Sequence, residues 1–174
     1  MAAAALPILV LFLLISAAAA EDTRAACSHA GPNQDLCLSS LSSGSDLRGL
    51  TGILTRSAAG NAAATAAHLI ALRDDSASGR AEPALFPCAN DCSEYYIDAV
   101  QQIDTSAAAL TDRADRDAAK WLEAALADIS SCEEACRGVA SREAGGVARR
   151  NEEARKMVNV SLSLTKRLLS KKYN

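Results

Sequence analysis

The stretch that decides the fold runs from residue 85 to residue 136; it opens with LFPCANDC (residues 85–92) and closes with CEEAC (residues 132–136). Each end carries two cysteines four residues apart, about one turn of an α-helix. On antiparallel helices, opposite residues have numbers with a constant sum, and this sum is 224 both for Cys88 with Cys136 and for Cys92 with Cys132. If both pairs face inward, the spacing predicts a helical hairpin joined by two neighbouring disulfides.

Two other uses of these cysteines fit the pattern less well. A zinc site generally uses closer cysteine pairs or adds histidines, and the two histidines, His29 and His68, lie far away in the sequence. A disulfide within either pair would have to close across a single helical turn, which the geometry of half-cystines rarely allows. We therefore expect bonds between the helices and no metal site.

Residues 1–20 have the pattern of a secretory signal peptide. They contain no charged side chain, have an apolar centre over residues 6–15 and end in the small residues Ala18, Ala19 and Ala20 before Glu21. The usual positive charge before the apolar run is missing, and its length would also suit a membrane anchor. The small-residue exit favours cleavage near Ala20 and secretion into an oxidising compartment, where cysteines pair.

The remaining chain, residues 21–174, is expected to form one domain, with an N-terminal hairpin over residues 21–44 and a bundle over residues 45–172. Only 3% of the side chains in the full chain are aromatic and alanine is abundant, a composition that favours closely packed helices. Charge is distributed unevenly: residues 21–136 carry 18 acidic and 8 basic side chains, whereas residues 137–174 carry 3 acidic and 10 basic ones. The domain is an acidic body followed by a basic segment.

Cys27 and Cys37 bracket a segment, residues 28–36, in which glycine, proline, asparagine and aspartate disfavour regular structure. This pattern suggests a small N-terminal hairpin closed by its own disulfide. The alternative is that either cysteine pairs with the downstream cysteines, since six cysteines allow fifteen pairings.

Four amphipathic patterns, with apolar residues at three- and four-residue steps, predict the helices of the bundle. The links are expected at residues 74–80, at residues 111–117 and at Gly145 with Gly146. Four helices with short links indicate an all-α fold, an up-down-up-down four-helix bundle. The expected stripes are Leu47, Leu50, Leu54, Ala58, Ala62, Thr65 and Leu69, with Ser45 as N-cap; Leu85, Cys88, Cys92, Tyr95, Ala99, Ile103, Ala107 and Leu110; Ala118, Trp121, Leu122, Ala125, Ile129, Cys132 and Cys136; and Val147, Ala154, Val158, Leu162, Thr165 and Leu169.

The runs CSEYYIDA (residues 92–99) and WLEAAL (residues 121–126), followed by Cys132-Glu-Glu and preceded by a signal peptide and a cysteine pair, resemble the plant invertase and pectin methylesterase inhibitor family. The resemblance implies a stapled N-terminal hairpin ahead of a four-helix bundle. Carried over by position, it implies the disulfides Cys27 with Cys37 and Cys92 with Cys132. The family pattern lacks Cys88 and Cys136, whose spacing predicts a second rung beside the family one.

The resemblance implies that the chain binds a plant carbohydrate-active enzyme one to one in the apoplast or cell wall and blocks its substrate cleft. The sequence offers no contrary sign of catalysis: it has no Gly-x-Ser-x-Gly elbow, no phosphate loop and no metal-ligand cluster. We therefore expect no enzymatic activity and no cofactor. Nucleic acid is not expected as a partner, nor is a membrane once the signal is cleaved.

The choice of target depends on the link between the second and third bundle helices. Family members that inhibit invertase often carry a Pro-Lys-Phe motif there, but this link reads TDRADRD (residues 111–117). The WLEAAL run looks more like that of the pectin methylesterase inhibitors, so pectin methylesterase is the expected target and invertase the alternative. An acidic body would be steered toward a basic enzyme. The expected contact residues are the outward positions Glu94, Asp98, Gln101 and Asp117.

Three further features allow other interpretations. The basic segment suggests binding to pectate, although internal pairing with acidic helices is the simpler explanation. A bundle that takes up an apolar ligand is a third function class, which close-packed alanine seams argue against. Asn159 opens an Asn-Val-Ser glycosylation sequon inside a helical pattern, and His68 beside a stripe suggests a partly buried structural residue. The basic residues are Arg149, Arg150, Arg155, Lys156, Lys166, Arg167, Lys171 and Lys172.

Overall fold

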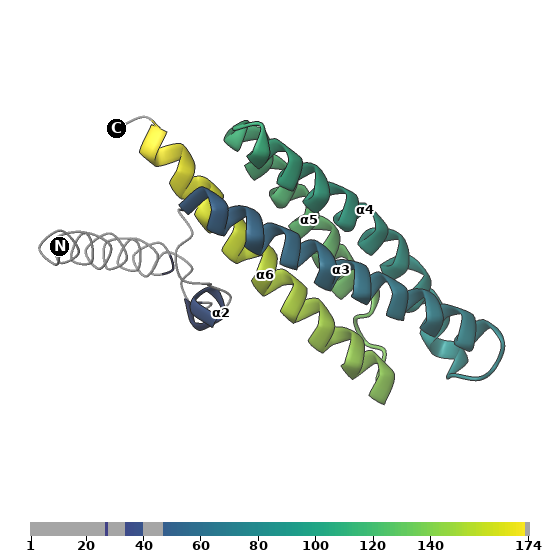
Figure 1. Ribbon diagram of the computed structural model, residues 1–174. Helices are drawn as coiled ribbons and strands as arrows, with labels where there is room; N and C mark the ends of the chain where they lie inside the picture. Colours follow the sequence, from purple (N-terminus) through teal and green to yellow (C-terminus); the bar gives the residue numbers. More distant parts are fainter. Residues whose placement is uncertain (1–26, 28–33, 40–46, 173–174) are drawn as a thin grey trace, which may run out of the picture.

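The computed structural model describes Cys27, residues 34–39 and residues 47–172, and the regular elements of these residues are all helical (Figure 1). Each of the four long helices packs on two neighbours: α3 and α5 both contact α4 and α6. The contacts close a four-helix bundle, as predicted. The elements are α2 (Gln34–Ser39), α3 (Leu47–Ala77), the 3-10 turn η2 (Pro83–Leu85), α4 (Phe86–Thr111), α5 (Asp115–Ala135) and α6 (Arg142–Lys172).

Small side chains fill the seams between these helices. Ala58, Ala62 and Ala125 are fully buried, which lets neighbouring backbones approach closely. The hydroxyls of Thr51 and Thr55 are also buried, and each donates a hydrogen bond to the carbonyl oxygen four residues earlier, at 2.7 and 2.8 Å. The polar groups are therefore satisfied within their own helix and do not weaken the core.

The core has two parts. The larger part joins α3, α4, α5 and α6 and includes Tyr96 and Leu122. The smaller part lies where α3 begins and α6 ends, and there Leu50 and Leu164 pack together with Cys27. Leu38 of α2 packs against this second part, so α2 lies against this end of the bundle.

The stripes predicted for α3 and α6 are buried except at Leu169, which is half-buried; on α4 and α5, Tyr95, Ala107 and Cys136 are half-buried and only the prediction for Trp121 is wrong. Tyr96 is fully buried where Tyr95 was expected, and Ser106 is buried where Ala107 was expected. On α5, Trp121 is 42% exposed, because residues 118, 122, 125 and 129 already form a complete helical stripe. The indole thus lies at the edge of the core and faces outward.

The predicted break at Gly145 and Gly146 is also wrong, since both glycines lie inside α6. The chain turns earlier, where Gly138 has φ of +84°, a left-handed conformation that favours glycine after a helix. Ser141 then caps α6, because its hydroxyl accepts a hydrogen bond from the N–H of Ala144 at 3.0 Å.

The other two links also differ from the prediction. Helix α3 continues to Ala77, into the segment expected as a linker, and only residues 112–114 separate α4 from α5. The predicted signal peptide and the N-cap Ser45 lie outside the described residues. No helix of the described part is both long and apolar enough to cross a membrane.

Candidate protein-binding surface on α4 and α5

Two disulfides hold one end of α4 against α5. Cys88 is bonded to Cys136 with Cα atoms 4.7 Å apart, and Cys92 to Cys132 with Cα atoms 4.5 Å apart. These are the two pairs that the numbering predicts. Cys27 is also disulfide-bonded, but the side chain of Cys37 lies outside the described residues, so the pair Cys27 with Cys37 stays a prediction.

Buried polar groups hold the other end of the same two helices. Asp115, at the start of α5, accepts two hydrogen bonds from the Arg48 guanidinium at 2.7 and 2.8 Å. The same guanidinium donates to the carbonyl oxygen of Leu110 at 2.9 Å. The Ser106 hydroxyl donates to the carbonyl oxygen of Ala118 at 3.0 Å. Fixed at both ends, α4 and α5 present a rigid outer surface.

The four predicted contact residues are all exposed. Glu94, Asp98 and Gln101 follow one another on one side of α4 at steps of four and three residues. Asp117 lies in the first turn of α5 and pairs with Lys120 at 3.5 Å. From the disulfide register, Asp117 is level with residue 107, about 20 Å along α4 from Glu94. The predicted residues therefore share one long surface but form no compact cluster.

Two residues that the sequence did not single out join α4 to α5 across this surface. The amide of Gln102 donates a hydrogen bond to the Asp128 carboxylate at 2.7 Å. Burial raises the pKa of Asp128, the Gln102 hydrogen bond opposes that rise, and the nearby charge of Asp98 adds to it. Asp98 and Asp128 are therefore neighbours on the same side of the helix pair.

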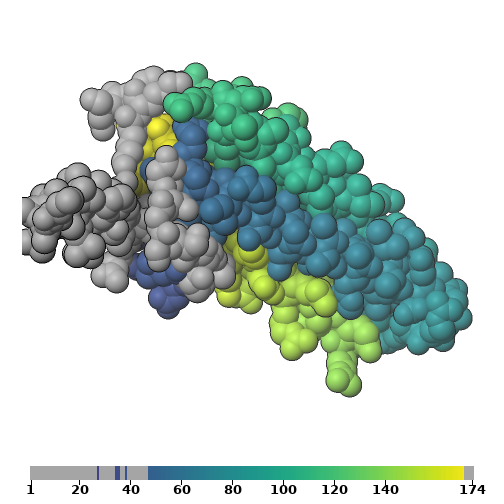
Figure 2. Space-filling view, in the orientation of Figure 1, coloured from purple at the N-terminus to yellow at the C-terminus, as the bar shows by residue number. Residues whose placement is uncertain are grey.

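Trp121 lies on the same side of α5, four residues after Asp117 and seven before Asp128. Large aromatic side chains are frequent anchors in protein interfaces. Figure 2 shows the outer surface of α4 lying open along one edge of the molecule. We call this surface the acidic face and define it as Glu94, Asp98, Gln101, Gln102, Asp117, Trp121 and Asp128.

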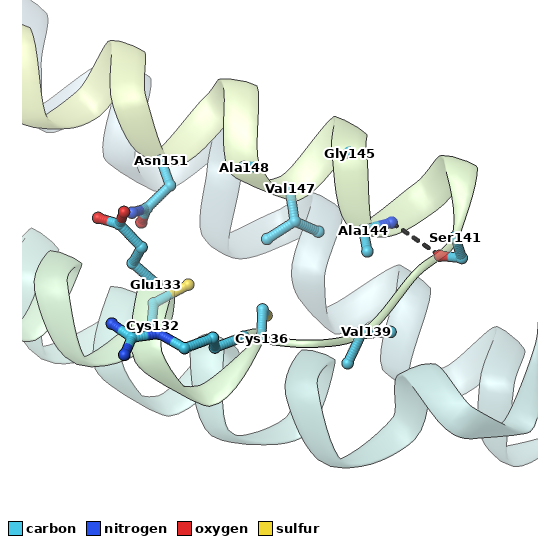
Figure 3. A pocket seen from close by; sticks show the side chains of 11 residues that line it. Cys132, Glu133, Cys136, Val139, Ser141, Ala144, Gly145, Val147, Ala148 and Asn151 are labelled. Atoms are coloured by element: carbon cyan, nitrogen blue, oxygen red, sulfur yellow. Dashed lines mark hydrogen bonds between the residues drawn. The ribbon is translucent and has the colours of Figure 1, made fainter.

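A pocket of about 380 Å³ lies between the end of α5 and the start of α6 (Figure 3). Cys132 and Cys136 line one wall, and Val147 and Asn151 line the other. The Asn151 side-chain oxygen accepts a hydrogen bond from the Tyr96 hydroxyl at 2.9 Å, and burial raises the Tyr96 pKa far above its ordinary value. The pocket holds no arrangement of nucleophile and base.

The sulfurs of Cys88, Cys92 and Cys136 lie within 4.8 Å of one another. Each belongs to a disulfide, so none offers the thiolate that a soft metal requires. No other group of three or more potential metal ligands occurs among the described residues.

The basic residues of α6 are partly paired. Lys166 contacts Glu123 of α5 at 2.7 Å and Lys156 contacts Glu152 at 2.6 Å, which supports internal complementarity over a polyanion site. The side chains of Lys171 and Lys172 lie outside the described residues. Asn159 is half-buried between two buried valines, a position unlike the loops where glycans are usually attached.

Comparison with known proteins supplies the identity of this architecture. A family model described as plant invertase/pectin methylesterase inhibitor matches residues 21–164. A crystal structure of a pectin methylesterase inhibitor from Arabidopsis thaliana has the same fold, with a TM-score of 0.65 and 17% identity over 85% of this chain and 96% of that chain. A search of curated proteins found no match.

Proposed function

This chain belongs to the plant invertase/pectin methylesterase inhibitor family, and we propose that its target is a pectin methylesterase, whose pectin-binding cleft it blocks in a one-to-one complex. Members of the family are inhibitors and not enzymes, so the chain is an inhibitor of the pectin methylesterase or invertase type. The family is extracellular, and the predicted signal peptide supports secretion to the apoplast.

The link between α4 and α5 is the feature that favours pectin methylesterase over invertase as the target. It consists only of Asp112, Arg113 and Ala114, and no proline or phenylalanine occurs there. The next residue, Asp115, is held by Arg48 and is only 3% exposed. A short link anchored in this way offers no protruding motif of the Pro-Lys-Phe kind that reaches an invertase active site.

The acidic face supports inhibition by occlusion. Its carboxylates favour a basic partner surface and suit a cleft lined with cations. Trp121 supplies a large apolar contact that becomes fully desolvated on binding. The two disulfides and the Arg48–Asp115 pair keep the face rigid, so little conformational entropy is lost on binding. Such a surface excludes the polymer substrate without performing chemistry.

The first test is a titration of a purified plant pectin methylesterase and a plant cell-wall invertase with the oxidised chain at mildly acidic pH. We expect methylesterase activity to fall to its minimum at one equivalent while invertase activity is unchanged. Inhibition of invertase alone would refute the proposed target but keep the family function. Inhibition of neither enzyme would refute both.

A second test separates the acidic face from the rest of the bundle. Trp121→Ala should raise the inhibition constant at least about tenfold, the cost of a typical interface anchor. Phe86→Ala is the matched control, since Phe86 is 40% exposed and lies about 25 Å from the level of Trp121 along α4. Equal effects of the two substitutions would place the binding surface elsewhere.

A further inference from the structure

The two disulfides between α4 and α5 touch each other. The Sγ atoms of Cys92 and Cys136, which are bonded to different partners, lie 3.3 Å apart. From this contact we propose that the four cysteines form a thiol–disulfide exchange centre, in which opening either bond lets the surviving bond move to a third pair, Cys92 with Cys136. The proposal is independent of the target enzyme.

The exchange step is a displacement at sulfur. When Cys136 is free, its thiolate attacks Cys92 Sγ; the Cys92–Cys136 bond forms, the Cys92–Cys132 bond breaks, and Cys132 leaves as a thiolate that takes a proton from water. When Cys92 is free, it attacks Cys136 Sγ in the same way and releases Cys88. The number of disulfides is unchanged, so the exchange itself needs no oxidant or reductant; the opening that precedes it consumes two equivalents of a small thiol, which leaves as a disulfide.

The surroundings allow this step with little movement. The two sulfurs need to approach by roughly an ångström to reach bonding distance. Cys136 is the residue that follows the last turn of α5, and the left-handed Gly138 just beyond it ends the regular backbone. Of the four cysteines, Cys136 therefore has the least constrained backbone. It is the attacking residue in one exchange and the attacked residue in the other.

Access from solvent favours one order of events. Cys92 and Cys132 are fully buried and Cys88 is 1% exposed, whereas Cys136 is half-buried and lines the α5–α6 pocket (Figure 3). A small reductant therefore reaches the Cys88–Cys136 bond first. Before and after exchange one bond still joins α4 to α5, either Cys92–Cys132 or Cys92–Cys136, while the free thiol moves between Cys136 and Cys132.

The test uses single substitutions in the otherwise intact chain. Cys88→Ser leaves Cys136 free beside the Cys92–Cys132 bond; after incubation in native buffer, acid quenching and peptide mapping should find the Cys92–Cys136 bond. If the two pairings have similar energy, about half of the free thiol moves from Cys136 to Cys132, at a rate that rises with pH. Cys132→Ser, which leaves Cys92 free, should yield the same Cys92–Cys136 bond.

Cys136→Ser is the matched control, because its free thiol is Cys88 and the Cys92–Cys132 bond should persist. Wild-type chain reduced with less than one equivalent of a phosphine provides a test without substitutions: single-bond species trapped by alkylation should include Cys92–Cys136. If only Cys92–Cys132 and Cys88–Cys136 are recovered, from the wild type and from both variants, the proposal is wrong.

Discussion

His68 of α3 is half-buried, and its pKa is lowered, first by burial and then by the charge of Arg150 on α6. As the pH falls below the ordinary histidine value of 6.5, the unfolded chain takes up this proton before the folded chain does. The stabilising effect is therefore complete above that value and is lost as the pH falls through the lowered pKa. Acidification to apoplastic pH should weaken the fold through this residue.

We expect His68→Gln to reduce the difference in melting temperature between about pH 7 and about pH 5, measured by circular dichroism. A titration followed by NMR checks the cause: Arg150→Gln should raise the His68 pKa toward its ordinary value. An unchanged pKa in that variant would show that burial alone lowers it.

Asp115 is the most deeply buried carboxylate of the described residues and holds three helices together through Arg48. Removing its charge leaves the guanidinium without its ionic partner at a site with little water. We expect Asp115→Asn to lower the free energy of unfolding by about 2–3 kcal/mol, somewhat less than for a fully buried pair because Arg48 retains some solvent contact. Urea denaturation measures the loss, and Asp117→Asn, at an exposed pair, should cost less than about 1 kcal/mol.

The exposure of Glu94, Asp98 and Asp117 was predictable, but that of Trp121 was not, and Asp128 was not singled out. Sequence periodicity identifies outward carboxylates, because a charged side chain is rarely placed in a core. The sequence pattern does not decide which of the adjacent residues Trp121 and Leu122 is buried. A small rotation of α5 about its axis would bury one side chain and expose the other. The same rotation on α4 buries Tyr96 in place of Tyr95, and the hydrogen bond to Asn151 selects it.

The two neighbouring disulfides between α4 and α5 should together stabilise the fold by less than twice the free energy that a single disulfide contributes. Each bond closes a loop, with sequence separations of 48 and 40 residues, and a closure of this size stabilises by about 4 kcal/mol. Once one disulfide has formed, the other restricts only the two short segments between Cys88 and Cys92 and between Cys132 and Cys136. We expect the double variant Cys88→Ser/Cys136→Ser to lose about 2 kcal/mol, and removal of all four cysteines to lose about 6 kcal/mol, both measured by guanidinium denaturation.

Polar contacts join α6 to the disulfide-joined pair, among them Lys166 with Glu123 at the surface and Tyr96 with Asn151 in the core. Tyr96→Phe keeps the ring but leaves the buried Asn151 oxygen without its donor. We expect a loss of about 1–2 kcal/mol in the free energy of unfolding. Hydrogen exchange should rise in α6 more than in α4 or α5; a uniform rise would contradict this local role.

Helix existence followed from the sequence, but helix ends did not. Gly145 and Gly146 suggested a break, yet open space surrounds both positions and a glycine in an exposed helix costs only about 1 kcal/mol. The stronger local cues were Ser141, which caps α6, and Glu143 in its first turn. The break occurs at Gly138, because that position alone in the connection requires a positive φ.

The molecule has an acidic body and a basic final helix, and some basic side chains of α6 form ion pairs within the molecule. The body before residue 137 keeps an excess of carboxylates, and four of them, Glu94, Asp98, Asp117 and Asp128, lie along the acidic face. A basic target would therefore be attracted over a distance comparable with the Debye length, before any contact forms. Association should be fast at low salt and slow at high salt.

The double variant Glu94→Lys/Asp98→Lys tests whether the face itself steers the target. We expect its association rate with pectin methylesterase, measured by stopped flow at low ionic strength, to fall about three- to tenfold, with a weaker dependence on salt. Asp74→Lys/Asp75→Lys changes net charge equally near the end of α3 and serves as the control. If both variants slow association equally, the attraction comes from total charge and not from the acidic face. If only Glu94→Lys/Asp98→Lys slows association, the acidic face itself attracts the target. The reason is that the electrostatic attraction is strongest for the charges nearest the partner, and these then lie on the surface that carries Trp121.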